Sequence, residues 1–318
     1  MICDLSFFCT NIILLTFALN NCQLDIVLST HALTKHFGSI KAVNALKMNI
    51  PRGTVFGMLG PNGSGKTTTL AMLLGIITPT SGSFSWFNNG AADINRKRIG
   101  AILEHPIFYP YLSGEQNLRI TAKIKGVDES DIERVLNIVD LHERKKSPAK
   151  TYSLGMKQRL SIGAALLGDP EVLLLDEPTN GLDPQGIAEV RALIQKVAEM
   201  GKTIVLASHL LDEVEKVCTH VAVIKNGNLL AEGSVREIIK GDKQIEIGGS
   251  DNDKIASLLH SYKGVKSITK EKDYLLISVE EGTMPAEINR YLLDNGFDVN
   301  HVALRKKRLE EQFLELTA

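Results

Sequence analysis

Short runs of apolar residues alternate along most of the chain with stretches in which apolar residues recur every three or four positions. Val172 to Leu175 is wholly apolar and Lys202 to Ala207 nearly so, which is typical of strands covered on both faces of a parallel sheet. The spacing predicts helices within Ser113 to Leu167 and from Pro184 to Met200, the latter with Asp183 as its N-cap. The other strands of this part are expected at Ile26 to Leu33, Ala42 to Ile50, Thr54 to Leu59, Ser83 to Phe87 and Ile99 to Leu103. Strands that alternate with helices predict an α/β fold with a mainly parallel sheet.

A different order of elements begins after Gly241. Between Gln244 and Ala303 the pattern predicts a strand, a helix, two strands, a helix and a strand, followed by a last helix from Lys307 to Leu316. The order β-α-β-β-α-β is typical of a split βαβ fold. We therefore expect a main domain over residues 25–241 and a small C-terminal α+β domain over residues 242–318.

The first 24 residues differ from the rest and are expected to form an apolar N-terminal extension. Residues 5–24 carry no charge, but their densest apolar part, Phe7 to Leu19, is shorter than the roughly 20 apolar residues of a membrane helix. The first Lys or Arg is Lys35, so the basic region that a secretory signal needs is missing. Two interpretations stay open: a single membrane anchor, or an upstream stretch translated from a misassigned start, of which we favour the second.

Charge and cysteine content narrow the class of protein. The 318 residues include 36 basic and 37 acidic side chains, a net charge of −1, so the chain has no basic excess for binding nucleic acid. The apolar share of 44% and the charged share of 23% argue against wholesale disorder and against a polytopic membrane protein. Of the four cysteines, only Cys218 lies beyond residue 22, which fits a reducing cytosol.

A glycine-rich turn lies between the strand that ends at Leu59 and the helix expected from Thr67 to Leu74. Its pattern is G-x-x-x-x-G-K-[ST], in which the glycines let backbone N–H groups turn inward around a phosphate chain. The helix N-terminus adds positive potential, Lys66 is expected to reach the β and γ phosphates, and the Thr67 hydroxyl is expected to ligate Mg²⁺. The expected nucleotide-binding residues of this loop are Gly60, Pro61, Asn62, Gly63, Ser64, Gly65, Lys66, Thr67 and Thr68.

Two adjacent carboxylates, Asp176 and Glu177, follow the apolar strand Val172 to Leu175. In a doubly wound sheet, ligands bind at the C-terminal ends of the strands. We expect Asp176 to bind Mg²⁺ through a water, and Glu177 to orient and deprotonate the water that attacks the phosphate. The sequence therefore predicts hydrolysis of a nucleotide.

Four segments together resemble the ATPase subunit of an ABC transporter. In the family's order and spacing they are Gly60 to Thr68, Tyr152 to Arg159, Leu175 to Pro184 and Ala207 to His209. The resemblance covers about residues 28–240, and the tail also resembles the C-terminal domain of exporters of the bacitracin-resistance type. It implies a P-loop NTPase cassette of the ABC type with a helical subdomain, which hydrolyses ATP with Mg²⁺.

In this family, two ATPase subunits sandwich two ATP molecules. The phosphate loop of one, here Gly60 to Thr68, faces the signature segment of the other, here Tyr152 to Arg159. The resemblance implies that Ser153 donates to the γ phosphate and that Gly155 lets the backbone approach it. Leu154 stands where the usual motif has Gly, and Met156 where it has Gln, a variant similar to that of the antibiotic-export branch. For Asp183 the resemblance adds a contact across the dimer to its expected place as a helix N-cap.

Three further roles come only from the resemblance. His209 is expected to contact the γ phosphate and to hold the attacking water together with Glu177. Glu104 stands where the family usually has Gln; a carboxylate can still ligate Mg²⁺, but it adds negative charge beside the triphosphate. Phe37 resembles the aromatic residue that stacks on adenine.

The segment from His105 to Leu118 is rich in aromatic residues and proline, and it is expected to form an irregular surface loop. Exposed aromatic residues in a loop, here Phe108, Tyr109 and Tyr111, are typical of a partner site. In the family this region takes up the coupling helix of the membrane subunit. The resemblance thus implies an ATP-dependent homodimer, cytoplasmic and peripheral on the inner face of the cell membrane. It would energise a separate permease, and the resemblance favours export of a peptide antibiotic or a similar amphiphile.

Two other functions are less well supported. A soluble ABC ATPase that acts on ribosomes or DNA usually carries two cassettes or a long coiled-coil insertion, and the sequence shows neither. A regulator that binds nucleotide without turnover is disfavoured because both Glu177 and His209 are present. The transported substrate is not readable from this chain, since substrate contacts belong to the permease.

Overall fold

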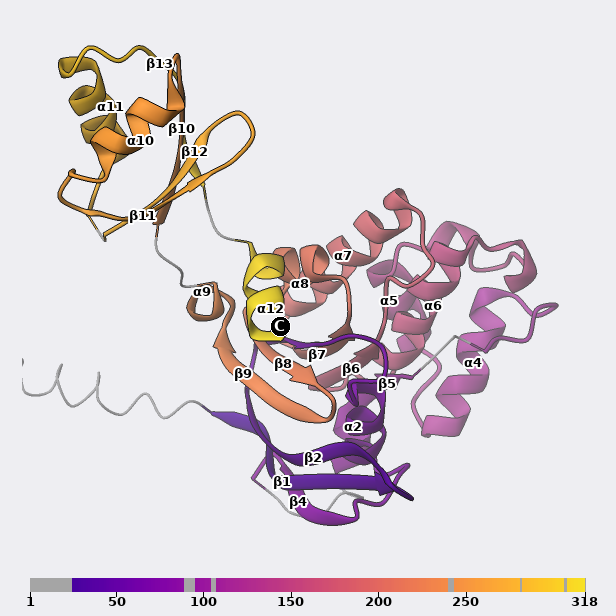
Figure 1. Cartoon of the computed structure of the whole chain (residues 1–318). Coiled ribbons are helices and arrows are strands. Elements are labelled where there is room, and N and C mark those ends of the chain that lie inside the picture. The colour runs from indigo at the N-terminus through magenta and orange to yellow at the C-terminus, as the bar shows by residue number, and fades with distance from the viewer. Residues whose placement is uncertain are drawn as a thin grey trace, which may run out of the picture. The chain divides into compact units, whose positions relative to one another are not determined.

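The computed structural model describes residues 25–88, 95–103, 107–239, 243–280, 282–305 and 308–317, without the side chains of Arg96 and Lys243. The chain divides into two compact units, residues 1–232 and 233–318, which we describe one at a time (Figure 1). Residues 1–24, and with them both interpretations of the apolar extension, lie outside the described residues. Residues 240–242 also lie outside the described residues, so the expected domain limit at residue 241 stays a prediction.

A six-stranded sheet in the order β5-β6-β7-β3-β8-β9 forms the centre of the first unit. The neighbouring pairs from β5 to β8 are parallel. Every residue of β6, β7 and β3 is buried, as expected for strands covered on both faces. In the order of the sheet, the strands are Ile99–Ile102, Val172–Asp176, Thr203–Ser208, Val55–Leu59, His220–Lys225 and Asn228–Ser234.

An antiparallel sheet in the order β2-β1-β4 lies on the other side of α2, which spans Lys66–Leu73. This helix contacts both β2 and β6 and therefore lies between the two sheets (Figure 1). Phe56 and Trp86 are among the largest side chains of the core that the sheets and α2 share. The predicted strand to Phe87 ends one residue earlier, because Phe87 has a left-handed φ of 53°. The strands of this sheet are β1 Ile26–Phe37, β2 Ile40–Pro51 and β4 Ser81–Trp86.

Helices α4, α5 and α6 pack against one another and form a helical part of the first unit (Figure 1). A capping box begins α4: the Gln116 N–H donates to Ser113 Oγ, and the Ser113 N–H donates to Gln116 Oε1. The apolar positions of α5 face inward, and Val135 and Leu136 are fully buried. The helices are α4 Gly114–Lys125, α5 Asp131–Ile138, α6 Leu154–Leu166, α7 Pro184–Glu199 and α8 Leu211–Val217, with short 3₁₀ helices at Arg96–Arg98, His142–Arg144 and Ala149–Thr151.

The second unit contains an antiparallel sheet in the order β11-β12-β10-β13, with its own apolar core. Ile255 and Leu259 of α10 and Ile288 and Leu292 of α11 pack in this core with apolar residues of the strands. The element order is the predicted split βαβ order. Its elements are α9 Val235–Ile238, β10 Lys243–Gly249, α10 Asn252–Leu259, β11 Val265–Lys270, β12 Leu275–Val279, α11 Pro285–Asp294, β13 Val299–Arg305 and α12 Leu309–Thr317.

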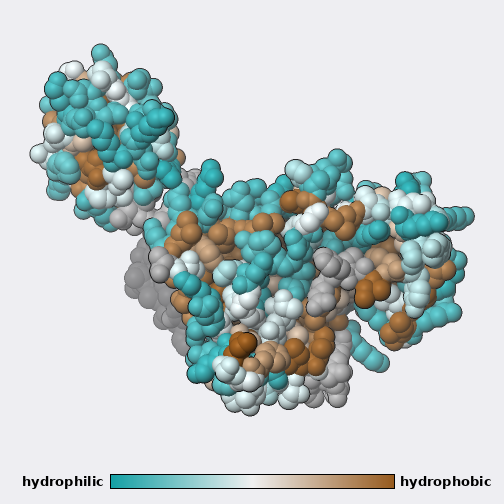
Figure 2. All heavy atoms as spheres, turned by 45° about the vertical axis from the view of Figure 1, so that its right-hand side comes forward, coloured by the Kyte–Doolittle hydropathy of each residue, from teal (hydrophilic) through white to brown (hydrophobic). Residues whose placement is uncertain are grey.

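The α/β fold predicted from the alternating pattern is confirmed by the parallel sheet and its covering helices. The pattern had not identified α8 or the hairpin of β8 and β9. Hydrophilic and apolar residues are interspersed over the face seen in Figure 2. Within the described ranges, no helix has both the length and the apolar character that crossing a bilayer requires.

Candidate nucleotide site

The phosphate loop connects β3 to α2 and ends in a left-handed glycine. Gly65 is the N-cap residue of α2, has a φ of 104°, and leaves the helix without a side-chain cap. A Cβ atom at Gly65 would lie 2.3 Å from the carbonyl oxygen of Ala42, so no larger residue fits there. The first N–H groups of α2 therefore meet no capping side chain and can bind an anion.

A pocket of about 530 Å³ borders this loop, which is within the size range of small-ligand sites. Nine predicted residues line it: Phe37, Asn62, Gly63, Ser64, Gly65, Lys66, Thr67, Thr68 and Glu177. Gly60 and Pro61 do not; their carbonyl oxygens accept hydrogen bonds from Lys66 Nζ, at 2.7 and 3.2 Å. Four lining residues were not anticipated: Ile40, Lys41, Ala42 and Asn226. Their residue types carry no signal for nucleotide binding, and only the fold brings them to the pocket.

Lys66 and Glu177 line the pocket, and His209, which does not line it, is joined to them through Glu177. Lys66 Nζ lies 3.5 Å from Glu177 Oε1, and His209 Nδ1 lies 2.8 Å from Glu177 Oε2. The side chains of Lys66 and Glu177 are 5% and 20% exposed, so water screens their charges only weakly. Glu177 has a left-handed φ of 46°, uncommon for a residue other than glycine, and turns the chain sharply where β6 ends. The strand end thereby holds one carboxylate between a cation and an imidazole.

Asp176 is the last residue of β6, a strand whose residues are all buried, and is itself 5% exposed. Thr67 is exposed where it lines the nucleotide pocket. Asp176 does not line the nucleotide pocket. A carboxylate and a hydroxyl are oxygen donors of the kind that Mg²⁺ uses together with phosphate oxygens, so the chemistry of these two residues fits the ion. Among the residues that the structure describes, no group of three or more His, Cys, Asp or Glu side chains is placed so that it could hold a metal ion by itself. Glu104, the other predicted ligand, lies outside the described residues.

A second pocket, of about 410 Å³, lies where α6 and α7 begin. Ser153 Oγ accepts a hydrogen bond from the Met156 N–H at 3.1 Å, and Asp183 Oδ1 accepts one from the Gly186 N–H at 2.9 Å. Both residues are helix N-caps, which confirms the cap predicted at Asp183. Gly155 lines the same pocket, so Ser153, Gly155 and Asp183, which are all expected to contact the other chain's ATP, come together. They do not join the phosphate loop, because no described residue lines both pockets.

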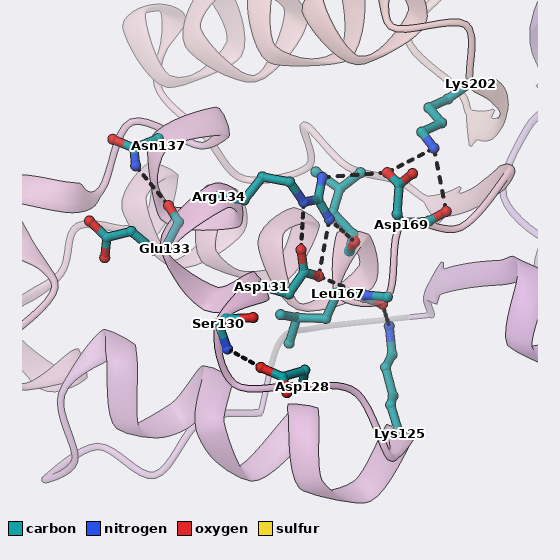
Figure 3. Close-up of polar contacts among 12 residues, drawn as sticks. Lys125, Asp128, Ser130, Asp131, Glu133, Arg134, Asn137, Leu167, Asp169 and Lys202 are labelled. Carbon is teal, nitrogen blue, oxygen red and sulfur yellow. Dashed lines mark hydrogen bonds and ion pairs between the residues drawn. The ribbon is translucent and has the colours of Figure 1, made fainter.

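Charged side chains hold the opposite end of α6 (Figure 3). Lys125 Nζ donates to the carbonyl oxygens of Ala164, Ala165 and Leu167, at 2.8, 3.0 and 3.2 Å. These carbonyl groups lie in the last turn of the helix or just beyond it, where intrahelical partners run out. Burial lowers the pKa of Lys125 to about 8, against the opposite effect of the charge on Asp131.

Asp131 and Arg134 of α5 also form hydrogen bonds with the backbone at this end of α6 (Figure 3). Arg134 donates to the Asp131 carboxylate and, at 3.1 Å, to the Leu166 carbonyl oxygen, while Asp131 accepts the Gly168 N–H at 2.8 Å. Burial raises the pKa of Asp131, but the hydrogen bonds from Arg134 and Gly168 outweigh it, and the pKa lies below its usual range. The end of α6 is therefore fixed to both α4 and α5.

The predicted aromatic contact residues are mostly exposed. Phe37, at the nucleotide pocket, is 48% exposed. Tyr109 and Tyr111 are 62% and 78% exposed, whereas Phe108 is half-buried. The buried Asn117 amide fixes the loop backbone, since it accepts the Tyr109 N–H at 2.8 Å and donates to the Tyr109 carbonyl at 3.1 Å. Two tyrosine rings thus project from a loop whose backbone is held in place.

Comparison with known proteins gives consistent matches. A family model described as ABC transporter matches residues 43–180. The bacitracin transport ATP-binding protein BcrA of Bacillus licheniformis is 41% identical over 297 residues, 91% of this chain and 97% of that protein. The lantibiotic transport ATP-binding protein SrtF of Streptococcus pyogenes is 41% identical over 206 residues, 65% of this chain and 90% of that one. Among solved structures, cbiO1 of Clostridium perfringens, part of an ABC transporter complex, is 28% identical with a TM-score of 0.62 and covers 74% of this chain and 96% of its own.

Proposed function

This chain belongs to the ATP-binding proteins of the ABC transporter family, and we propose that it dimerises on ATP to drive a separate permease exporting a peptide antibiotic or a similar amphiphile. It is an ATPase coupled to transport, as the family is. Relatives named for bacitracin and lantibiotic transport support a peptide substrate. An ATPase acting on ribosomes or DNA is not favoured, since these relatives are named as transport proteins.

One observation carries the catalytic part of the proposal: Glu177 lies between Lys66 and His209 at the edge of the nucleotide pocket. A general base has to lie within reach of both its orienting group and the reacting water. The 2.8 Å contact with His209 orients the carboxylate, and the nearby Lys66 marks where the phosphate chain would lie.

In the proposed reaction, Lys66 Nζ exchanges the carbonyl oxygens of the loop for the β and γ phosphates of ATP. Glu177 takes a proton from a water molecule, whose oxygen forms a bond to the γ phosphorus while the bond from phosphorus to the bridging oxygen of ADP breaks. His209 keeps the carboxylate in the orientation that this transfer needs. Mg²⁺, held through Thr67 and Asp176 together with phosphate oxygens, would supply positive charge against the triphosphate.

In the proposed dimer, a second copy of the chain completes each site. The pocket of Ser153, Gly155 and Asp183 shares no described residue with the nucleotide pocket, so one chain alone does not join them. Helix N-termini border both pockets, and their dipoles favour negatively charged phosphates. A head-to-tail arrangement of two copies would bring the second pocket of each chain to the ATP of the other.

The exposed loop with Tyr109 and Tyr111 is the proposed contact with the permease. Tyrosine is enriched at protein interfaces because it combines a large apolar ring with a hydroxyl group. With this contact, the protein would lie peripherally on the cytoplasmic face of the membrane. Phe108 belongs to the same loop but is half-buried, so it would offer the permease less of its ring than the two tyrosines.

The substitution Glu177→Gln tests the catalytic proposal. It removes the proton acceptor but keeps the size of the side chain, so we expect ATP binding and dimer formation with hydrolysis lowered about 10²- to 10⁴-fold. Turnover and size-exclusion chromatography with and without ATP and Mg²⁺ measure both properties. Glu199→Gln, at the exposed end of α7, is the matched control. Near wild-type turnover of Glu177→Gln would remove Glu177 from the role of base.

Capture of the tagged full chain from detergent-solubilised membranes tests the transport part. We expect a polytopic membrane protein to co-purify, and the double variant Tyr109→Ala, Tyr111→Ala to retain less of it, because the variant loses two exposed rings. ATP binding by this variant, which should not change, shows that it is folded. Recovery of ribosomal or DNA-associated proteins in place of a membrane protein would favour the alternative function.

A further inference from the structure

A turn far away in the sequence contacts the phosphate loop. Asn226 and Gly227 connect β8 to β9, and both have left-handed φ values, 51° and 77°. Asn-Gly is a preferred two-residue hairpin turn because both central residues need a positive φ. Asn226 also lines the nucleotide pocket, yet no role described above uses this turn.

Two backbone hydrogen bonds join the turn to the phosphate loop and to β2. The Gly227 N–H donates to the carbonyl oxygen of Ser64 at 3.0 Å, and the Asn44 N–H donates to the carbonyl oxygen of Gly227 at 2.9 Å. Ser64 belongs to the phosphate loop and is buried, whereas Asn44 belongs to β2. Asn44 Nδ2 also donates to Asn228 Oδ1 at 2.8 Å. One glycine therefore bridges the phosphate loop and β2.

The space around this glycine is closed as well. A Cβ atom at Gly227 would lie 2.9 Å from the carbonyl oxygen of Ala42 and 3.0 Å from that of Lys41. The same Ala42 oxygen is the atom that a Cβ at Gly65 would meet at 2.3 Å. The Ala42 carbonyl thus lies against both the turn and the phosphate loop. A shift of the turn toward this carbonyl therefore has to displace the carbonyl, and with it the phosphate loop.

We propose that the Asn226–Gly227 turn is a positioning element of the nucleotide site, which holds the phosphate loop at a fixed distance from the β1–β2 hairpin. This hairpin carries Phe37 and Ile40, so the turn connects the phosphate end of the pocket to its aromatic end. A ligand that contacts both ends binds more tightly when they are already arranged, because less ordering accompanies binding. The turn would act on ATP binding by a single chain, independently of the permease and its substrate.

Gly227→Ala tests the inference against a matched control, Gly201→Ala. Both glycines have similar φ values, 77° and 82°, so both alanines experience the same left-handed strain. A Cβ at Gly201, however, meets no atom within 4 Å. For Gly227→Ala we expect the KM and the dissociation constant for ATP to rise about tenfold, with kcat at saturating ATP within about twofold of wild type. Gly201→Ala should keep both ATP constants, while thermal unfolding reports the strain in each variant.

Equal ATP affinities in the two variants would overturn the inference, since strain alone would then explain both. If Gly227→Ala fails to fold, Asn228→Ala decides instead. That variant removes the side-chain bonds to Asn44 and to the Asn226 carbonyl, at 2.8 and 3.0 Å, and leaves the turn residues in place. A rise in the KM for ATP of about threefold with unchanged kcat supports the inference, and an unchanged KM overturns it.

Discussion

The helices α2 and α6 both begin at segments expected to meet phosphate, but their N-termini are built in opposite ways. At α2 the N-cap is Gly65, and no side chain caps the helix. At α6 the Ser153 hydroxyl accepts the Met156 N–H at 3.1 Å. The first N–H groups of α2 are therefore free of a capping side chain and can bind an anion. At α6, one N–H group is already bonded to Ser153, and in the proposed dimer a phosphate of the ATP on the other copy would approach this end.

The opposite ends of the two helices differ in the same way. The last turn of α2 has no basic residue, and the helix is located by apolar burial between two sheets. The end of α6 is instead held by the half-buried ammonium of Lys125 and by Arg134, which donate to its last carbonyl groups (Figure 3). Both helices are held by packing, but α6 is also held by side-chain hydrogen bonds at its two ends, which α2 lacks.

The largest effect is expected at α2, from Lys66→Ala. Charge-assisted hydrogen bonds contribute about 1.5–3 kcal/mol, so removal of this buried ammonium should lower the affinity for ATP about 10- to 100-fold. Equilibrium titration with ATP measures the change, and Lys47→Ala, an exposed lysine of β2 outside the pocket lining, is the control. Unchanged affinity in Lys66→Ala would contradict the assignment of the phosphate loop.

A smaller effect is expected at α6, from Ser153→Ala. Loss of the N-cap should lower the free energy of unfolding by about 1 kcal/mol in urea titrations. It should also weaken ATP-dependent dimerisation in the Glu177→Gln background, while ATP still binds each chain. Ser113→Ala is the control, because it removes the comparable cap of α4 and Ser113 does not line the second pocket. Equal dimerisation of the two variants would exclude Ser153 from the interface.

The last effect concerns the half-buried charge at the end of α6, and it appears only as a dependence on pH. The pKa of Lys125 is about 8 in the folded chain, against an ordinary value of 10.5. Between these values the unfolded chain binds more protons, so burial of the charged Lys125 lowers the free energy of unfolding most below pH 8, and this cost decreases as pH rises toward 10.5. From pH 7.5 to 9, wild type should therefore gain about 1 kcal/mol relative to Lys125→Met in urea titrations.

Lys123→Met is the control for this pH dependence, because Lys123 lies on the same helix with its side chain 69% exposed. A pH-dependent difference for Lys125→Met no larger than that of Lys123→Met would show that burial does not perturb Lys125. The end of α6 would then be held no differently from an ordinary helix end.

Much of the site was predictable because its signals are short in range. The glycine pattern before Lys66, the apolar run before Asp176 and the cap at Asp183 each depend on residues only a few positions apart. The structure confirms the α/β arrangement and that cap, and it brings nine predicted residues into one pocket. Ile40 and Asn226 were missed because neither residue type signals a ligand, and each reaches the pocket through a strand or hairpin that packing places there.

Local sequence was thus enough to predict a phosphate loop before a helix and two carboxylates after a buried strand. Only the packed chain established that Glu177 lies between Lys66 and His209, and that Gly227 holds Ser64. Apolar periodicity and backbone preference act over a few residues. These contacts instead join segments far apart in the chain, whose approach depends on how the strands align in one sheet and how α2 packs between the two sheets.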